Sequence, residues 1–528
     1  MMSRSRMIYV ANVSRIAWRI VLLDQRFSSN CASNKSNVRV RFAPSPTGML
    51  HLGGLRTMLY NYLFARQQGG QVILRIEDTD QTRLVPGADK KLEEIIWWSG
   101  LHYDEGPSVA GEYGPYYQSQ RIPLYQKYAN RLIENDYAYP CFCTQRELDL
   151  VKMQNIKSGL NPRYNGKCRS ISREIASARI QNGESHVIRL KVPDGQTNFY
   201  DQVYGEMSID NKSIEDQVLI KSDGFPTYHM ANVVDDHLMD ITHVLRGEEW
   251  LSSTAKHALI YKGLTWICPQ FVHLPLLHNI TGGKLSKRHG DVFVESFKTA
   301  GYMPEAVVNF VAFLGWSPDP TGRRQLFTID EMINEFSLEN LRRTAAKVDY
   351  QKLSWFQRQY HTTRCKNESK LEALVSELKE LVIKTTCNGT NSCHSELLNN
   401  DYLKRIILSL EDRRPLIPEI ATKCYYYWLD PSINANDMKT ITSKPHEIIN
   451  QFIQYFKDTK TEMIDDNQIN LCLKELQRDY SINKKSFMTL IRYCLTGEKV
   501  GEPVSILFNL LKKEVIQRRL SVASSLAS

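Results

Sequence analysis

The segment from 41 to 54 carries residue types that can bind a nucleotide phosphate. It follows an alternating apolar run and opens an amphipathic one, so it is predicted to be a turn between a strand and a helix. The N-terminus of a helix attracts phosphate through its free N–H groups, and His51 in the first turn could donate a further hydrogen bond. A proline-interrupted turn with a solvated histidine explains the segment alone equally well. The residues expected at the phosphates are Pro46, Gly48, His51, Gly53 and Gly54.

A second segment, far downstream, combines two glycines with three cations and a hydroxyl. Lysines in such a loop could neutralise nucleotide phosphates, and the leading Gly282 and Gly283 would let the loop close over them. A lone loop of this kind is usually a solvated turn. Its conjunction with His51 favours the nucleotide, and the residues expected to contact it are Lys284, Leu285, Ser286, Lys287 and Arg288.

Together these segments resemble the two signatures of class I aminoacyl-tRNA synthetases. His51-Leu52-Gly53-Gly54 matches the first signature, and the stretch from Lys284 to Arg288 matches the second. With Arg75-Ile76-Glu77-Asp78-Thr79-Asp80 and Arg246-Gly247-Glu248-Glu249-Trp250, the sequence is similar to glutamyl-tRNA synthetases of the bacterial and mitochondrial type. The resemblance extends over residues 38 to about 350 and is weak beyond them.

The resemblance implies ATP-dependent ligation of L-glutamate to tRNA(Glu) through a glutamyl-adenylate, with Mg²⁺ accompanying ATP. A carboxylate attacks the α-phosphate and is already ionised at neutral pH, so no activated nucleophile is required. His51, Lys284 and Lys287 are then expected to be catalytic, and Glu249 to lie near the nucleotide. The second signature departs from its usual Lys-Met-Ser-Lys-Ser form, and its last residue, Arg288, would suit a further phosphate contact. Charging of tRNA(Gln) with glutamate is left open.

Charge complementarity predicts a glutamate pocket. An α-ammonium group requires an anion and a γ-carboxylate a guanidinium, which Glu77, Arg41 and Arg246 at three predicted strand ends would supply. Glutamine would leave the guanidinium groups underpaired. Plain alternatives are an i, i+3 ion pair between Arg246 and Glu249, a core position for Tyr228, and a helix-capping turn formed by Glu77, Asp78 and Asp80. Including residues that the resemblance alone implies, the expected glutamate site is Arg41, Phe42, Ala43, Ser45, Glu77, Tyr228, His229, Met230, Ala231, Asn232 and Arg246.

A possible metal site precedes the middle of the chain. Its spacing, C-x-C, twenty residues and Y-x-x-x-C, matches a structural zinc site of some bacterial members of the family. Three thiolates and one oxygen could hold Zn²⁺ tetrahedrally and fold a small insertion. Buried cysteines without metal are the alternative. The candidate ligands are Cys141, Cys143, Tyr164 and Cys168, and the basic residues around them, suited to the acceptor end of tRNA or simply solvated, are Lys152, Lys157, Arg163, Lys167 and Arg169.

Length and composition narrow the class of protein only slightly. At 528 residues the chain exceeds one core, and about three to five domains are expected. Residues 1–37 hold six basic residues and the single acid Asp24, a net +5 that leaves +4 of the total +9 for the remainder, so charge alone does not indicate nucleic acid. No apolar run approaches the roughly 18 residues that span a membrane, so no membrane association is expected. Eleven scattered cysteines favour a reducing compartment.

Residues 1–37 are rich in Ser and Arg and nearly free of acid. Helical spacing groups Arg15, Arg19 and Arg26 on one face and apolar side chains on another, which predicts a mitochondrial transit peptide. A disordered basic arm that grips RNA is the alternative. The expectation is therefore a protein of the mitochondrial matrix that serves mitochondrial translation.

The predicted fold is α/β, with a Rossmann-like parallel-sheet catalytic domain split by an α/β insertion domain and followed by an all-helical anticodon-binding region. The β-α-β unit has a second strand over Val72–Ile76, and a later strand over Ile241–Leu245 delivers Arg246. No strand is expected after Asp291, and one of the helices expected there spans Asn340–Lys347. The expected boundaries are 38–115 and 222–290 for the catalytic halves, 116–221 for the insertion, 291–350 for a stem-contacting helical region and 351–528 for the anticodon-binding region.

Four rival interpretations are considered. A tRNA-modifying glutamyl transferase would normally lack the helical third, and a small-molecule nucleotidyltransferase would not need the long helical tail. Glutaminyl-tRNA synthetases are separated from this sequence by the Arg41, Arg246 and Glu77 pocket and by a helical rather than β-rich tail. A catalytically silent RNA-binding scaffold would be expected to lose His51 or Lys287, and both are present. A monomer is expected.

Overall fold

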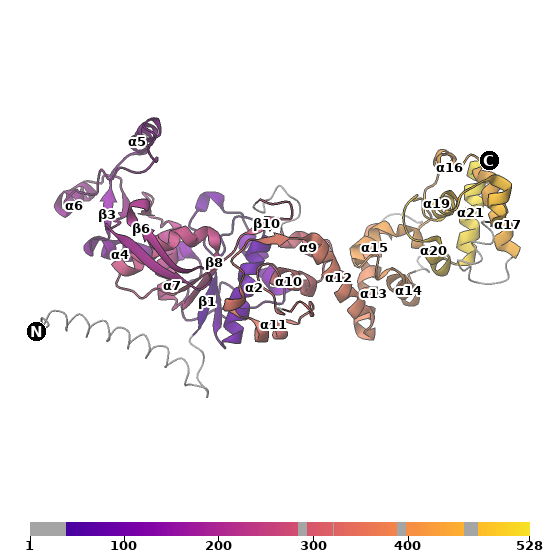
Figure 1. Ribbon diagram of the computed structural model, residues 1–528, viewed down its shortest axis with the longest axis horizontal. Coiled ribbons are helices and arrows are strands. Elements are labelled where there is room, and N and C mark those ends of the chain that lie inside the picture. Colours follow the sequence, from indigo (N-terminus) through magenta and orange to yellow (C-terminus); the bar gives the residue numbers. More distant parts are fainter. Residues whose placement is uncertain (1–37, 284–292, 320, 388–397, 459–473) are drawn as a thin grey trace, which may run out of the picture. The chain divides into compact units, whose positions relative to one another are not determined.

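The computed structural model describes residues 38–283, 293–319, 321–387, 398–458 and 474–528 (Figure 1). The chain forms two compact units. One runs to Val294 and includes Val311–Val348, and the other comprises Glu295–Phe310 and Asp349–Ser528. No helix among the described residues is long and apolar enough to cross a membrane.

The first unit begins with the predicted β-α-β motif. Strands β1 (Arg39–Phe42) and β2 (Gln71–Leu74) pair in parallel and are joined by α2 (Leu52–Gln67). The leucines at helical spacing in α2 are fully buried, which explains why this segment packs as a helix on the strands. The second strand is shorter than expected because it ends at Leu74, and Ile76 makes a separate bridge with Tyr117.

A four-stranded sheet continues the same unit with the strand order β6-β5-β9-β8. The strand that carries Arg246 starts two residues later than expected and contains this residue rather than preceding it. Strands β8 and β9 are parallel, and β8 lies beside β1 because Thr242 N–H donates to the Arg39 carbonyl at 2.9 Å. The strands are β5 (Gln196–Asp201), β6 (Gly205–Asp210), β8 (His243–Gly247) and β9 (Gln270–Leu274). The same unit contains the helices α3 (Ala88–Trp98), α7 (Tyr228–Leu238) and α8 (Thr254–Gly263).

A three-stranded antiparallel sheet, β3-β4-β7, lies within the segment expected as an insertion. Its apolar side chains join a hydrophobic core with α4, α7 and α8, in which Tyr125, Leu190 and Ile260 are fully buried. The sheet therefore packs firmly against the helix that carries several of the expected glutamate-binding residues. Its elements are β3 (Ala138–Cys141), β4 (Val187–Leu190), β7 (Val218–Ile220), α4 (Ile122–Glu134), α5 (Gln145–Lys157) and α6 (Arg173–Gln181).

The expectation that strands end before Asp291 is wrong. Strand β10 (Leu277–Asn279) pairs in parallel with β11 (Ala346–Val348). The predicted helix over Asn340–Lys347 is therefore absent. The backbone at its end is extended and paired with a distant segment, since Ala346 N–H donates to the Leu276 carbonyl at 3.0 Å. A partner so distant in the sequence cannot be predicted from the local pattern of apolar residues.

The second unit is helical over the residues described, as expected. Several helices begin at asparagine N-caps, where Asn367, Asn399 and Asn483 accept hydrogen bonds from backbone N–H groups three residues on. From Val294 onward, α11 (Ile329–Glu335) belongs to the first unit. The other described helices are α9 (Val294–Thr299), α10 (Pro304–Ala312), α12 (Tyr350–Cys365), α13 (Glu368–Val382), α14 (Asn400–Leu410), α15 (Ile417–Lys423), α16 (Ala435–Ile441), α17 (Pro445–Asp458), α19 (Lys484–Thr496), α20 (Val504–Leu510) and α21 (Lys513–Ala527).

Candidate active site

His51 is the N-cap residue of α2 and its ring is fixed by its own helix. The Gly54 backbone N–H donates to His51 Nδ1 at 3.1 Å. Because Nδ1 accepts, the neutral ring carries its hydrogen on Nε2, which makes Nε2–H a donor suited to a phosphate oxygen. A Cβ at Gly53 would lie 3.1 Å from this ring, so the glycine also makes room for the histidine itself. Gly48 has a φ of +144°, a conformation that favours glycine, and Pro46 is buried.

The lysine-containing loop is only partly described. Gly282 and Gly283 have φ values of +94° and +82° and form a turn in which Gly282 N–H donates to the Asn279 carbonyl at 3.0 Å. These left-handed conformations explain why glycines precede the loop. The residues expected to contact ATP from this loop, Lys284, Leu285, Ser286, Lys287 and Arg288, lie outside the described residues.

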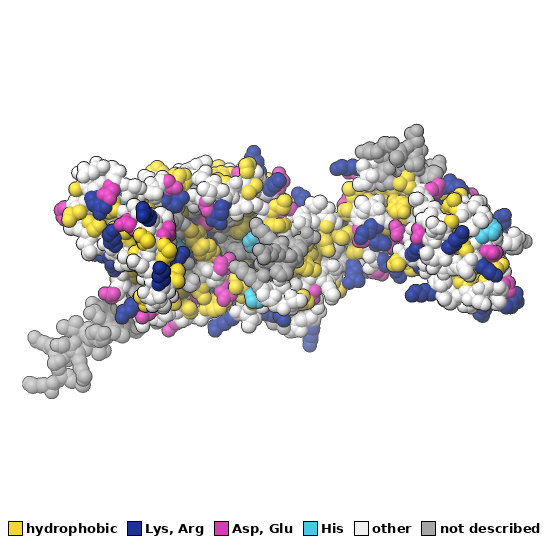
Figure 2. Space-filling view, turned by 90° about the horizontal axis from the view of Figure 1, so that it is seen from above, with side chains coloured by type: hydrophobic (Ala, Val, Ile, Leu, Met, Phe, Trp, Pro, Cys, Tyr) yellow, Lys and Arg dark blue, Asp and Glu magenta, His cyan; other side chains and the backbone are white. Residues whose placement is uncertain are grey.

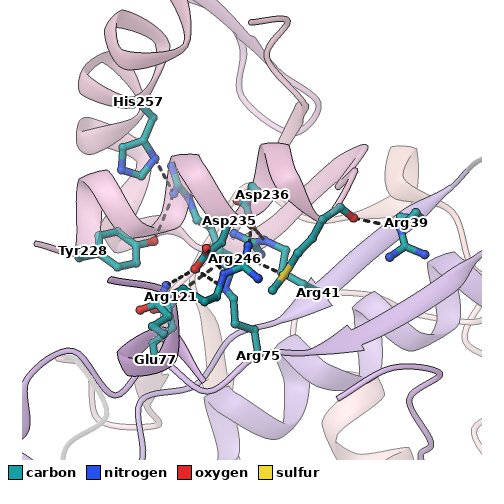
Figure 3. A network of polar contacts seen from close by, with 12 residues as sticks. Arg39, Arg41, Arg75, Glu77, Arg121, Tyr228, Asp235, Asp236, Arg246 and His257 are labelled. Atoms are coloured by element: carbon teal, nitrogen blue, oxygen red, sulfur yellow. Dashed lines mark hydrogen bonds and ion pairs between the residues drawn. The ribbon is translucent and has the colours of Figure 1, made fainter. Parts of the chain in front are cut away.

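Arg41 and Glu77 meet in a buried charge network (Figure 3). Asp236 Oδ1 accepts from Arg41 Nε at 3.0 Å and from Arg75 Nη1 at 2.7 Å, and Arg75 Nη2 donates to Glu77 Oε1 at 3.2 Å. Burial alone would lower the pKa of Arg75, but Asp236, Asp235 and Glu77 raise it, so this guanidinium stays charged. Burial raises the pKa of Glu77, and the nearby Arg75 and Arg41 oppose that rise. Strand β1, the segment after β2 and helix α7 thus bring opposite charges together.

Asp235 anchors the far side of this network. It accepts from Arg121 Nε at 2.7 Å, Gln118 Nε2 at 2.9 Å and the Tyr125 hydroxyl at 2.8 Å. Sequence reasoning assigned no role to Asp235 or Asp236. A signal was present, because two adjacent acids directly follow the apolar pair Val233 and Val234 in α7, and buried carboxylates require partners.

Helix α7 places its expected residues in different surroundings. The Tyr228 hydroxyl accepts from Arg246 Nη1 at 3.2 Å. Asn232, with its amide oxygen turned toward Arg75, accepts from Arg75 Nη2 and donates to Asp236 Oδ2, both at 3.2 Å. The side chains of Met230 and Ala231 are fully buried in the hydrophobic core instead. Tyr228 and Asn232 therefore lie within the charged cluster, while Met230 and Ala231 pack away from it.

The loop after β1 brings Glu77 beside the segment 42–45. The Phe42 carbonyl accepts from Arg75 N–H and the Pro44 carbonyl from Glu77 N–H, both at 3.0 Å. The Phe42 side chain is buried, Ala43 is half-buried and Ser45 is exposed. The backbone pairing explains how a residue three positions beyond the end of β2 is held next to β1.

Arg246 on β8 is buried, and its four donor contacts are to the neutral groups of Tyr228, Thr254, His257 and His273. The alternative of an ion pair with Glu249 is not found. Glu249 is exposed in a short 3₁₀ helix, η4 (Glu248–Ser253), and its carboxylate folds over Gly247, where a Cβ would lie 2.2 Å from Oε2.

Comparison with known proteins identifies the family. Residues 37–355 match the family model described as tRNA synthetases class I (E and Q), catalytic domain, and residues 368–524 match an anticodon binding domain. A glutamate–tRNA ligase of Clostridioides difficile is 40% identical in an alignment of 498 residues that covers 92% of this chain and 98% of that protein. The chain belongs to the glutamate–tRNA ligase family.

Family membership extends to the three-dimensional structure. A glutamate–tRNA ligase from Elizabethkingia meningosepticum, solved in complex with its amino acid, is 34% identical with a TM-score of 0.76 over 93% of this chain and all of that chain. A glutamate–tRNA synthetase from Elizabethkingia anophelis is 34% identical with a TM-score of 0.75, covering 92% and 99% of the two chains. The α/β catalytic domain followed by a helical anticodon-binding domain is therefore the fold of this family, as predicted.

The four candidate zinc ligands converge at the edge of the β3-β4-β7 sheet. The Sγ atoms of Cys141, Cys143 and Cys168 all lie within 4.8 Å of one another. The Tyr164 hydroxyl lies 3.4 Å from Cys141 Sγ and 3.9 Å from Cys143 Sγ. All three cysteines are free thiols. Three soft sulfur donors and one oxygen at this separation suit a tetrahedral Zn²⁺ ion.

The basic residues near these cysteines are partly engaged within the protein. Lys167 pairs with Glu147 at 2.7 Å, and Arg169 pairs with Asp216 at 2.7 Å. Arg163 Nη1 donates to the Lys212 carbonyl at 2.8 Å. On the face seen in Figure 2, lysines and arginines are interspersed with acidic and apolar side chains. These three basic side chains are therefore partly neutralised or fixed by the protein itself, and their expected contact with tRNA stays a prediction.

Proposed function

We propose that this protein forms glutamyl-adenylate from L-glutamate and ATP and transfers the glutamyl group to mitochondrial tRNA(Glu). Membership of the glutamate–tRNA ligase family supports the reaction. The observation that carries the assignment to glutamate is the buried cluster in which Arg246 has neutral partners while Arg41 and Glu77 share one network (Figure 3). This cluster offers both an anion for the α-ammonium group and a cation for the γ-carboxylate.

The proposed chemistry is positioning and charge neutralisation rather than proton abstraction. Glutamate's α-carboxylate is ionised at neutral pH and attacks the α-phosphate, and pyrophosphate leaves. His51 Nε2–H and the N-terminus of α2 would bind phosphate oxygens, and Mg²⁺ would accompany ATP. By family resemblance, Lys284 and Lys287 would neutralise the departing pyrophosphate.

Discrimination against glutamine follows from charge. A carboxamide in place of the γ-carboxylate would leave a buried guanidinium without a counter-charge, which predicts selectivity on the order of 10³ to 10⁵. Size cannot separate the two amino acids, because they are nearly isosteric.

We also propose that residues 1–37 direct the protein to the mitochondrial matrix. Two observations support this: the acid-poor composition with Arg15, Arg19 and Arg26 on one helical face, and a catalytic-domain match that begins only at residue 37. Fusion of 1–37 to a fluorescent reporter should send the reporter to mitochondria, whereas a fusion with the three arginines changed to glutamine should not. Cytosolic fluorescence from the native fusion would favour the alternative, an RNA-gripping arm.

Zn²⁺ is proposed as a structural ion held by Cys141, Cys143, Cys168 and Tyr164, supported by the convergence of their side chains. The ion would stabilise the small cluster of Tyr139, Phe142 and Ala176 around it, which has few apolar residues of its own.

The direct test is aminoacylation with labelled glutamate on two purified mitochondrial tRNAs. Charging of tRNA(Glu) supports the proposed function, and its absence with folded protein rejects it. We propose that tRNA(Gln) is also charged with glutamate, and a product on tRNA(Glu) alone would refute that extension. We further propose that the protein is a monomer, which the molar mass measured in solution will decide.

A further inference from the structure

Arg246 differs from the other buried arginines of the site in the charge of its partners. Its guanidinium donates to His273 Nε2 at 2.9 Å, His257 Nδ1 at 3.0 Å, the Tyr228 hydroxyl at 3.2 Å and Thr254 Oγ1 at 2.8 Å. Among the residues that the structure describes, no carboxylate forms an ion pair with Arg246, although its side chain is only 5% exposed. A buried cation held by neutral acceptors is unfavourable unless an anion arrives.

The neighbouring guanidinium groups are already neutralised. Asp236 accepts from both Arg41 and Arg75, and Arg75 also contacts Glu77. In Figure 3 dashed lines join Arg41 and Arg75 to Asp236, while Arg246 is bonded to Tyr228 and His257. Arg246 is therefore the guanidinium whose charge remains available in this cluster.

His273 presents the lone pair of its Nε2 to Arg246, because its other ring nitrogen, Nδ1, is hydrogen-bonded to Asp201. Asp201 Oδ2 lies 2.6 Å from His273 Nδ1, and the same oxygen accepts from the His273 backbone N–H at 3.1 Å. A guanidinium can only donate, so Nε2 must accept from Arg246 and the hydrogen of the ring must be on Nδ1, where it is donated to Asp201. Asp201 is itself held by the backbone N–H groups of Val203 and Tyr204, both at 2.9 Å.

His257 is fixed in the complementary way. Its Nδ1 accepts from Arg246, so its hydrogen is on Nε2 and is donated to His229 Nδ1 at 3.1 Å. Burial lowers the pKa of His229 to about 3, with Lys256 and Arg246 adding to the effect. Burial, followed by Arg246, also lowers the pKa of His257 well below its usual value. Both rings are therefore neutral acceptors at neutral pH.

We propose that His273 and His257 are positioning residues that fix the orientation of the Arg246 guanidinium group and leave its charge for the γ-carboxylate of the substrate. His273 is held in place by Asp201, and His257 by His229. This inference rests on the proposed role of Arg246 in binding glutamate. A carboxylate in place of either histidine would neutralise Arg246 and remove the preference for an anionic substrate. Neutral hydrogen-bond acceptors orient the guanidinium group without neutralising its charge.

Glutamate selectivity thus depends on residues that do not touch the substrate. Two histidines on different elements, β9 and α8, bind different nitrogens of Arg246, so the guanidinium plane is defined from two directions. The protein uses four of the five N–H groups of Arg246, so one Nη2–H is left for the substrate. A guanidinium that can rotate would no longer direct this N–H and its charge at the γ-carboxylate, whereas a neutral carboxamide would lose less. Loosening Arg246 should therefore weaken glutamate binding more than glutamine binding.

The test compares His273→Phe and His257→Phe with His273→Gln and His257→Gln. Phenylalanine removes the acceptor, whereas glutamine retains an oxygen that can accept from Arg246. The assay is pyrophosphate exchange in the presence of tRNA(Glu), with separate KM values for glutamate and ATP, and with glutamine as competing substrate. The matched control is His243→Phe, because His243 is a half-buried histidine on β8 that packs against Phe64 and has no bond to Arg246.

The expected result for the phenylalanine variants is a rise of about tenfold or more in the glutamate KM, an ATP KM within about twofold of wild type and a reduced preference for glutamate over glutamine. The glutamine variants should recover most of the loss, and the control should resemble wild type. An unchanged glutamate preference, or equal changes in the KM values for glutamate and ATP, would overturn the proposal. If a phenylalanine variant does not fold, Asp201→Asn takes its place, because Asp201 holds His273. The rise in Tm that glutamate causes should then be smaller in Asp201→Asn than in wild type, and an equal rise would overturn the proposal. Wild-type protein inactive with glutamate would reject the proposed function, not this inference.

Discussion

Asp236 Oδ1 accepts hydrogen bonds from Arg41 and Arg75 at once, at 3.0 and 2.7 Å. One carboxylate on α7 thereby fixes guanidinium groups from β1 and from the segment after β2. Burial would raise the pKa of Asp236, but Arg41 and Arg75 lower it, so the group is ionised. The network therefore contributes both to stability and to substrate binding, because Arg41, which Asp236 orients, is expected to contact glutamate.

Asp236→Asn should destabilise the fold by about 3 kcal/mol, because two buried guanidinium groups lose their shared counter-charge. We expect a lower midpoint in urea denaturation and a raised KM for glutamate. Asp240→Asn is the matched control, since Asp240 is exposed and accepts one hydrogen bond, from the Tyr113 hydroxyl. Equal midpoints for the two variants would contradict the role of Asp236.

Lys287→Ala should abolish glutamate-dependent pyrophosphate exchange in the presence of tRNA, because a positive charge at the departing pyrophosphate is lost. Binding of tRNA, measured by filter retention, should remain nearly intact. Lys298→Ala, which alters an exposed lysine on α9, serves as the control and should keep its exchange activity. Unchanged exchange in the Lys287 variant would reject the assignment of this loop.

Purified, active protein should contain close to one zinc ion per chain. Cys168→Ser should lose the metal and expose the segment 141–168 to proteolysis, because metal binding contributes folding free energy there. Cys268→Ser, an exposed thiol outside the cluster, should retain zinc. Elemental analysis of the purified protein measures the zinc content per chain directly. A zinc content near zero in active wild-type protein would contradict the proposal.

Acid should destabilise the helical unit through His361. This side chain is fully buried, and neither ring nitrogen has a hydrogen-bond partner among the described residues. Burial, followed by Arg364, lowers its pKa to about 4. The unfolded chain therefore binds a proton between about pH 6.5 and 4 that the folded chain does not, so stability falls as pH falls through this window, by about 2 kcal/mol at pH 5.

His361→Leu should remove that dependence. We measure the denaturation midpoints of variant and wild type at pH 7.5 and at pH 5. The difference in stability between them should shift in favour of the variant at pH 5, because no group titrates at this position in the variant. A difference between variant and wild type that stays constant from pH 7.5 to pH 5 would show that His361 does not titrate as described.

The sequence allowed prediction of those features that local patterns encode. The β-α-β unit followed from the leucine spacing of α2, and the convergence of Arg41 and Glu77 followed from the rule that parallel strands end at one edge of a sheet. Long-range partners could not be predicted. Strand β11 is defined by pairing with β10, and the roles of Asp201 and His273 exist only because β5 and β9 bring them to Arg246.

The most direct test of the central claim is tRNA-dependent pyrophosphate exchange with glutamate and glutamine measured side by side, for wild type and Arg246→Gln. The account predicts that wild type prefers glutamate by about 10³-fold or more and that the variant loses most of this preference through the glutamate KM, because the cation without a protein counter-charge has been removed. Similar activity of wild type with both amino acids, or a variant that keeps its preference for glutamate, would contradict it.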